Sequence, residues 1–221
     1  MTGQATAGQA TAEQPARPAA GDATTAGDGI TVWFTGLPSA GKTTLARALT
    51  ARLLATGHRV EMLDGDELRT YLTADLGFSR QDRAANVLRV GFVAHLLSRN
   101  GVIVVCSLIS PFRDDRDQVR ALHGDRFMEV YLSTPVEVCA ERDVKGLYAR
   151  QRAGDLTGLT GVDDPYEPPL DPELVVPTHA QDLEASLDMV WAALPTGITG
   201  AGPTGVTGVT GTGVTRAVVG Q

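Results

Sequence analysis

Apolar residues in the middle of the chain follow two alternating patterns, short β-branched runs and longer amphipathic stretches. Five short runs predict strands, at residues 30–35, 59–63, 101–108, 126–132 and 174–176. Three longer stretches predict helices, at residues 42–56, 79–99 and 180–194. Strands that alternate with helices at this spacing predict an α/β fold with a doubly wound parallel sheet, which binds ligands at the carboxyl ends of its strands.

The two ends of the chain differ from this middle part. Residues 1–28 consist largely of Ala, Gly, Thr, Gln and Asp without apolar periodicity, so we expect a disordered tail. Residues 195–221 form a low-complexity Gly-Thr-Val run, in which the glycines weaken any strand. The predicted folded unit is therefore a single domain at residues 29–194, followed by a flexible C-terminal tail.

Composition and charge narrow the classes of function. The 221 residues carry a net charge of −7, which argues against a broad surface for nucleic acid or anionic membranes. No signal-peptide pattern and no membrane-spanning run is present. Cys106 and Cys139 lie in apolar surroundings without metal-like spacing, and we interpret both as reduced core residues of a cytoplasmic protein.

The segment GLPSAGKTT after the first predicted strand matches the phosphate-binding pattern G-x-x-x-x-G-K-[ST]. Its glycines let backbone N–H groups turn toward a polyphosphate, and the following helix adds its positive end. We expect Lys42 at the β and γ phosphates and the Thr43 hydroxyl on Mg²⁺. The predicted nucleotide-binding residues are Gly36, Leu37, Pro38, Ser39, Ala40, Gly41, Lys42, Thr43 and Thr44.

A phosphate-binding loop alone is compatible with a switch, a motor or a kinase. The guanine-reading motif of GTPases is absent, and the strand at 101–108 ends in serine rather than in a Walker B aspartate. These absences favour a small-molecule kinase, in which the acceptor hydroxyl takes the place of the attacking water. The segment VVCSLISPFR, with Ser107 and Ser110, then becomes a candidate wall for the acceptor.

Two carboxylates, Asp64 and Asp66, follow the second predicted strand in LDGDELR. We expect one to support Mg²⁺, directly or through water, and the other to orient or deprotonate the acceptor hydroxyl, with Asp66 favoured for the acceptor. The structural alternative is a helix start with Asp66 as N-cap, which is compatible with those roles. On helix 79–99, Arg83, Asn86 and Arg89 form a polar stripe that either binds a ligand or faces solvent.

Residues 145–168 are rich in glycine, proline and charge and show no periodicity. A structureless loop of this length in a compact domain is usually functional. Since a kinase has to exclude water from its site, we expect this segment to be a lid. Its first residue is Lys145.

In combination, these blocks resemble the adenylylsulfate kinases (APS kinases), which are P-loop kinases. The resemblance covers residues 29–194 and rests on GLPSAGKTT, LDGDELR, DLGFSRQDRAANVLRVG, SLISPFRDDRD and the segment from EVYLSTP to DDPYEPP. It implies transfer of phosphate from Mg·ATP to the 3′-hydroxyl of adenosine 5′-phosphosulfate (APS), which gives PAPS. It also implies a homodimer and a functional link to a separate ATP sulfurylase.

Carried over residue by residue, the resemblance implies an APS pocket. Phe78 would stack on the adenine, Arg69 and Arg83 would face the phosphosulfate, and Lys145 would help close the lid. Ser110 is implied as a phosphoserine intermediate or as a positioning residue, although in-line transfer needs no covalent step. The full implied set is Arg69, Phe78, Arg83, Asn86, Ile109, Ser110, Lys145 and Leu147.

Three positions depart from the family pattern, at Ala85, Leu88 and Leu159. Leu159 replaces an aromatic residue, and we expect this change to remove a stacking surface for the purine. The departures leave open a P-loop kinase for another small alcohol or nucleotide. A non-catalytic nucleotide-binding regulatory subunit is a further alternative, although Lys42, Thr43 and the two aspartates argue against it.

Overall fold

A computed structural model describes residues 29–199 of the chain. Its centre is one five-stranded sheet with strand order β2-β3-β1-β4-β5, and every neighbouring pair is parallel. The strands are β1 (Thr31–Thr35), β2 (Val60–Asp64), β3 (Ile103–Ser107), β4 (Phe127–Leu132) and β5 (Leu174–Val176). The doubly wound α/β fold is confirmed, and all five predicted strands are present.

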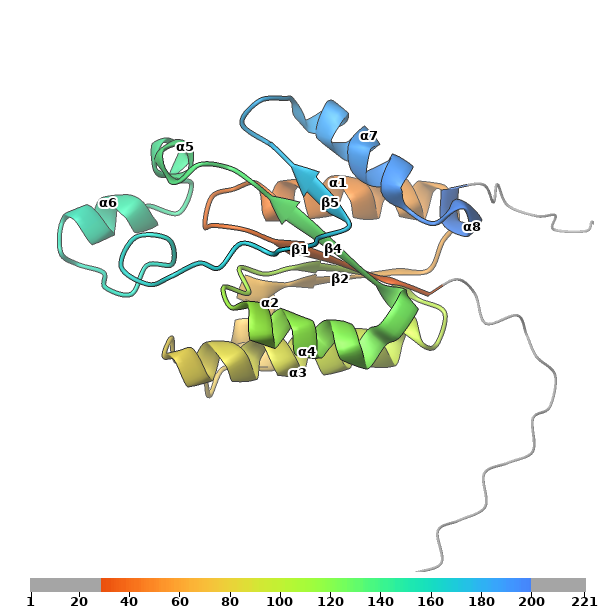
Figure 1. The fold of residues 1–221 in the computed structure, drawn as a ribbon, viewed down its shortest axis with the longest axis horizontal. Helices are drawn as coiled ribbons and strands as arrows, with labels where there is room; N and C mark the ends of the chain where they lie inside the picture. The colour runs from red at the N-terminus through yellow and green to blue at the C-terminus, as the bar shows by residue number, and fades with distance from the viewer. Residues whose placement is uncertain (1–28, 200–221) are drawn as a thin grey trace, which may run out of the picture.

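Helices cover both faces of this sheet (Figure 1). One face carries α1 (Lys42–Ala55) and α7 (Leu183–Ala193), and the other carries α3 (Arg80–Ser98) and α4 (Arg113–His123). The remaining helical elements are α2 (Gly65–Tyr71), η1 (Gly124–Arg126), α5 (Val136–Arg142), α6 (Leu147–Arg152) and α8 (Thr196–Thr199). Figure 1 places α5 and α6 beyond the carboxyl ends of the strands, where the sequence predicts the ligand.

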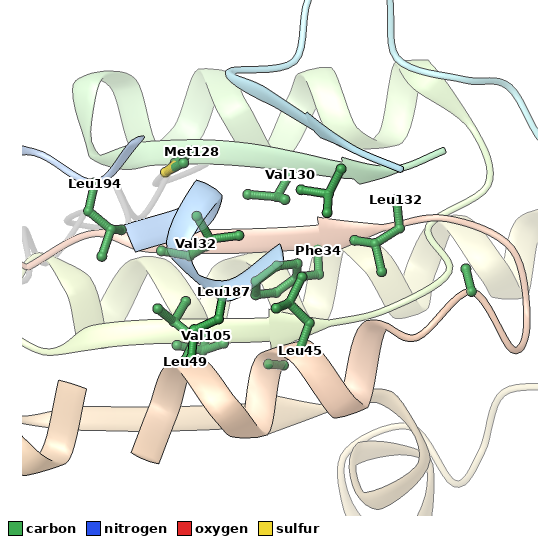
Figure 2. Packing of buried hydrophobic residues seen from close by; sticks show 14 of the residues in the cluster. Val32, Phe34, Leu45, Leu49, Val105, Met128, Val130, Leu132, Leu187 and Leu194 are labelled. Carbon is green, nitrogen blue, oxygen red and sulfur yellow. The ribbon is translucent and has the colours of Figure 1, made fainter. Parts of the chain in front are cut away.

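Strand β1 is buried on both faces because it lies between two apolar clusters. Val32 and Phe34 point toward α1 and α7, and Figure 2 shows them packed against Leu45, Leu49 and Leu187. Trp33 points to the opposite face, into the cluster under α3 and α4. Alternate side chains of β1 thus fill two separate cores, which fixes the register of this strand in the sheet. The position of the loop that follows β1 is fixed with it.

The folded unit extends beyond its predicted end at residue 194. Helix α8 follows Pro195, its Ile198 is buried in the core cluster, and the Ile198 carbonyl lies 2.9 Å from the His58 ring nitrogen Nε2. The predicted boundary is therefore wrong by at least five residues, because one isoleucine in a Gly-Thr sequence finds an apolar site. The predicted tail at 1–28 and the rest of the C-terminal tail, 200–221, lie outside the described residues.

Two helices and part of the lid depart from the predictions. Helix α4 was not predicted because its buried side chains are largely polar and charged, with Arg116, Asp115 and Val119 among them. Helix α5 was not predicted either, because its seven residues are too few to show a helical period. The segment at 145–168, expected to be structureless, contains α6 and a bridge between Thr160 and Asp164.

Candidate active site

The phosphate-binding loop connects the carboxyl end of β1 to the first turn of α1. Gly41 precedes the helix in the left-handed region with φ 99°, and Ser39 also has a positive φ of 62°. A side chain at Gly36 would place its Cβ 2.9 Å from the Leu132 carbonyl oxygen, so this position requires glycine. This geometry supports the predicted cradle of backbone N–H groups at a helix N-terminus.

Lys42 folds back over this loop. Its Nζ donates hydrogen bonds to the carbonyl oxygens of Gly36, at 2.9 Å, and Leu37, at 2.7 Å. Burial lowers the pKa of Lys42 to about 7. A polyphosphate in the loop would supply the negative charge that keeps this ammonium protonated.

Thr43, Asp64 and Ser107 meet at the carboxyl ends of β2 and β3. The Thr43 hydroxyl donates to Asp64 Oδ2 at 3.0 Å, and Thr43 Oγ1 lies 3.2 Å from Ser107 Oγ. These hard oxygen donors fit Mg²⁺, which usually keeps water and phosphate oxygens among its ligands. Among residues 29–199 no group of three His, Cys, Asp or Glu side chains forms a closed metal cage. The sequence predicts Ser107 in the candidate acceptor wall, whereas the structure places its hydroxyl beside Thr43.

Asp64 and Asp66 face different partners. Asp64 Oδ1 accepts a hydrogen bond from the backbone N–H of Asp66 at 3.0 Å, so Asp64 is the N-cap of α2 and the alternative that assigned this cap to Asp66 is wrong. Asp66 is exposed and forms an ion pair with Lys145 at the start of the lid. One carboxylate therefore lies against the phosphate-binding loop, and the other faces the lid.

A cavity of about 600 Å³ joins these groups to the acceptor side. Of the predicted site residues, the cavity is lined by Pro38, Ser39, Gly41, Lys42, Thr43, Thr44, Asp64, Asp66, Arg69, Phe78, Arg83, Asn86, Ile109, Ser110, Lys145 and Leu147. Gly36, Leu37 and Ala40 belong to the same loop but do not line the cavity. Segments more than 100 residues apart in the sequence thus share one cavity.

Phe78 lies at the acceptor end of the cavity between two arginines. Its ring is 65% exposed, and its centroid lies 4.4 Å from the Arg69 guanidinium carbon and 5.6 Å from that of Arg83. Burial and the charge of Arg83 lower the pKa of Arg69. An exposed ring beside two cations suits an aromatic, anionic ligand.

The polar stripe on α3 divides into two parts. Arg83 is buried and donates to the Phe78 carbonyl at 2.9 Å and, in the lid, to the Gly158 carbonyl at 2.8 Å. Asn86 is also buried and accepts a hydrogen bond from Thr73. Arg89 instead forms an exposed ion pair with Asp75. The first two residues therefore line the cavity, where the ligand-binding interpretation expects them, and the third faces solvent.

Ser110 closes the wall at the end of β3. The residue is buried, has a positive φ of 40°, and its hydroxyl donates to Thr35 Oγ1 at 3.0 Å. The same oxygen accepts a hydrogen bond from the Trp33 indole N–H at 3.1 Å. Because both hydrogen bonds are made within the protein, this hydroxyl helps to hold the wall in place.

Beyond the phosphate-binding loop, the cavity continues along residues that the sequence did not reveal. Arg142 Nη2 donates to the Thr178 carbonyl at 2.8 Å, and the Thr178 hydroxyl donates to the Ala40 carbonyl at 2.8 Å. Gln181 and Asp182 extend this lining toward α7. These residues stand in no recognisable motif, and only the fold brings them beside the phosphate-binding loop.

The three departures from the family pattern lie away from the cavity. Ala85, Leu88 and Leu159 are absent from its lining, and Leu88 is exposed at the surface of α3. Leu159 is buried in the core cluster of α1 and α7, near Tyr148. Leu159 itself therefore packs in the core and does not line the cavity. The expectation that the change from an aromatic residue removes a stacking surface for the purine stays a prediction.

Comparison with known proteins decides the family. The adenylylsulphate kinase family model matches residues 28–177. The chain belongs to the adenylylsulphate kinase family. The adenylyl-sulfate kinase of Rippkaea orientalis is 54% identical over 166 residues, which cover 75% of this chain and 91% of the relative.

Solved structures agree with this membership of the adenylylsulphate kinases. The Mycobacterium tuberculosis APS kinase CysC in complex with AMPPNP and APS is 42% identical, with a TM-score of 0.72 over 76% of this chain and 98% of that one. The hexameric APS kinase from Thiobacillus denitrificans is 35% identical, with a TM-score of 0.60 over 76% of this chain and 29% of that chain. Within the described part of this adenylylsulphate kinase, no helix is long and apolar enough to cross a membrane.

Proposed function

We propose that this adenylylsulphate kinase transfers the γ-phosphoryl group of ATP to the 3′-hydroxyl of APS, giving PAPS and ADP. The observation that carries the proposal is the single cavity in which the phosphate-binding loop faces a wall with an exposed aromatic ring between two arginines. The CysC structure, a complex with both AMPPNP and APS, supports the same pairing of ligands.

The donor end of the cavity is assigned to ATP. The loop from Gly36 to Thr44 would cradle the phosphates, and Lys42 would leave its carbonyl partners to bind the β and γ oxygens. Arg142 and Thr178, which line the cavity beyond the loop, would hold the base of the donor. Phosphates neutralise the Lys42 charge, which burial disfavours in the free protein.

Thr43 and Asp64 would hold Mg²⁺, directly or through water, with Ser107 beside them. When bound, Mg²⁺ neutralises charge on the transferring phosphoryl group. The side chain of Asp64 also caps α2, so the same residue fixes the start of the helix that carries Asp66 and Arg69.

The acceptor end is assigned to APS. The purine would stack on Phe78, and Arg69 and Arg83 would bind the phosphosulfate through planar guanidinium groups. Asn86, Ile109, Ser110 and Leu147 complete the lining. The three departures from the family pattern lie outside this lining, which removes the main reason to favour another acceptor.

Asp66 is assigned to the proton of the acceptor hydroxyl. As the bond from the γ phosphorus to the ADP oxygen breaks, the 3′-oxygen bonds to that phosphorus and its proton passes to the Asp66 carboxylate. Lys145 would balance the Asp66 charge and bring the lid over the site. Ser110 would position the wall without carrying phosphate, because its hydroxyl is buried and already bonded.

A panel of acceptors tests the proposal. ADP release is measured with ATP, Mg²⁺ and each acceptor, and the product is identified by mass. APS should give acceptor-dependent ADP and a product heavier by one phosphoryl group. Release only with a different alcohol or nucleotide would favour the second kinase hypothesis, and no release with any acceptor would favour the regulatory subunit.

The homodimer and the link to a separate ATP sulfurylase stay predictions. The APS kinase from Thiobacillus denitrificans is hexameric. Light scattering of the full chain, with and without nucleotide, measures the state of this member.

A further inference from the structure

Arg116 lies directly behind the acceptor wall, outside the cavity lining. It comes from the second turn of α4, and its side chain is only 2% exposed. A guanidinium buried to this degree needs several acceptors to offset its desolvation. Its hydrogen-bond partners therefore show which segments of the protein Arg116 connects.

Three acceptors from three different segments surround this guanidinium. Nε donates to Glu129 Oε1 on β4 at 2.7 Å, and Nη1 donates to the Ser110 carbonyl at 2.6 Å. Nη2 donates to the Glu167 carbonyl at 2.7 Å, in the segment by which the lid returns to the domain. One side chain thus bonds to the sheet, the acceptor wall and the lid.

The wall and the returning lid segment are also joined directly. The Glu167 N–H donates to the Pro111 carbonyl at 2.8 Å, and the Arg113 N–H donates to Glu167 Oε2 at 2.9 Å. The Tyr166 hydroxyl lies 3.0 Å from Thr35 Oγ1, the atom that accepts the Ser110 hydroxyl bond. Ser110 is therefore held through its carbonyl by Arg116 and through its hydroxyl by a group that touches the lid.

Ser110 needs such support because its backbone has a positive φ of 40°, which is unfavourable for a residue with a side chain. A planar fork can hold two carbonyls and a carboxylate at fixed angles, whereas a lysine ammonium cannot reach all three. The other carboxylate oxygen of Glu129 pairs with Arg120, which is partly exposed and also pairs with Glu173.

We infer that Arg116 is a positioning residue that couples the end of the lid to the acceptor wall at Ser110. This inference rests on the proposed function only for the identity of the acceptor. A loosened Arg116 would let the wall and the lid shift independently, which weakens acceptor binding and leaves the ATP end unchanged.

Arg116→Lys tests this coupling because it keeps the positive charge beside Glu129 and loses the fork. The matched control is Arg120→Gln, on the same helix, which disturbs the Glu129 and Glu173 pairs but touches neither Ser110 nor the lid. In the full-length protein, Arg116→Lys should raise the KM for APS about tenfold while the KM for ATP changes less than about twofold. Arg120→Gln should lower the Tm and leave both KM values near those of the unaltered protein.

A second readout needs no activity. Trypsin can cleave the lid after Lys145, Arg150 and Arg152, and mass spectrometry times these cuts. The Arg116→Lys lid should be cut several-fold faster than the Arg120→Gln lid at equal distance below each Tm. The two readouts separate the proposed function from the coupling by Arg116. If the unaltered protein is inactive with APS, the proposed function is wrong, but the cleavage rates still test the coupling.

Equal APS KM values and equal cleavage rates in the two variants would overturn the inference. If Arg116→Lys does not fold, Tyr166→Phe takes its place, because it removes only the hydroxyl that touches Thr35. It should raise the KM for APS and speed lid cleavage in the same direction, and unchanged values in this variant would also reject the coupling.

Discussion

At the donor end of the cavity, nine consecutive residues supply the phosphate-binding loop, whereas the acceptor end is assembled from α2, α3, the end of β3 and the lid. In the proposed function, the donor loop would bind phosphate through backbone N–H groups and one lysine. The acceptor end relies on side chains, and its arginines are held by backbone carbonyls of neighbouring segments, as Arg83 is by Phe78 and Gly158.

This difference predicts which kinetic constant a substitution at each end of the cavity should change. A change in the donor loop removes charge stabilisation of the transferring group and should lower kcat. A change at the acceptor end loosens one of several holding points and should mainly raise the KM for APS. The following experiments test that division, beginning with the largest expected effect.

Replacing Lys42 by methionine should lower kcat with APS about 10³-fold, because no other cation reaches the γ phosphate from within the loop. The helix should persist, since the side chain keeps a similar length and the site is buried. Steady-state ADP release and circular dichroism measure the two effects. Lys145→Met is the matched control, expected to lose much less kcat; equal losses would erase the distinction between the two ends.

Asp64→Asn should raise the Mg²⁺ concentration for half-maximal activity about 10–100-fold, because one negative charge beside Thr43 is lost. Asparagine still caps α2, so stability should change little. A Mg²⁺ titration at saturating ATP and APS gives the result. Asp66→Asn should lower kcat without this shift, and the same Mg²⁺ shift in both variants would contradict the division of roles between the carboxylates.

Phe78→Leu should raise the KM for APS about tenfold, the usual cost of losing a base stacked on an aromatic ring. The KM for ATP should stay the same. Tyr71→Leu is the control, since Tyr71 is an aromatic residue of α2 that is 82% exposed and does not line the cavity. Equal effects of the two changes on the KM for APS would remove Phe78 from the acceptor site.

Leu159→Phe restores the aromatic residue that the family pattern has at this position. Because Leu159 is buried in the core, the larger ring should lower the free energy of unfolding by about 1–3 kcal/mol and leave the KM for APS unimproved. Thermal unfolding and APS kinetics measure both, with Leu159→Met as the volume-conserving control. A lower KM for APS in the phenylalanine variant would show that this side chain does reach the acceptor.

Proton uptake is the smallest effect. The folded pKa of Lys42 is lowered to about 7 from 10.5, so between these values the empty site holds a neutral amine. Phosphates raise this pKa again, so ATP binding at about pH 8 should take up as much as about one proton per chain, and less as the pH falls below about 7. Calorimetry in buffers of different ionisation enthalpy measures the uptake. Lys42→Met should abolish it, and an uptake that survives this change would have another source.

Local patterns predicted the sheet and the loop between β1 and α1 well. The loop motif lies within one turn and one helix start, and the five strands are short apolar runs whose burial in two cores follows from their alternation. Ser79 caps α3 by accepting a hydrogen bond from the backbone N–H of Asp82, three residues further on. In each of these cases the residues that decide the structure are neighbours in the sequence.

Features that depend on distant partners escaped the sequence. Helix α4 buries Arg116 and Asp115 instead of an apolar stripe, so its periodicity carried little signal. Arg142 and Thr178 reach the donor end only through the packing of α5 and of the loop before α7. The position of Leu159 likewise depends on how the lid folds back on the core. The family resemblance supplied most of the acceptor residues, which spacing alone did not define.

The hydrogen bond from Trp33 to Ser110 gives the protein a built-in optical probe. The sequence contains two tryptophans, and the other, Trp191, belongs to α7 and packs against the opposite core cluster, with the Arg52 guanidinium over its ring. Trp33 is fully buried, so its emission should be blue-shifted and sensitive to any movement of the indole N–H partner. Binding of a ligand against the acceptor wall can therefore be followed by the intrinsic fluorescence of the unlabelled protein. A Trp191→Phe variant would isolate the Trp33 signal.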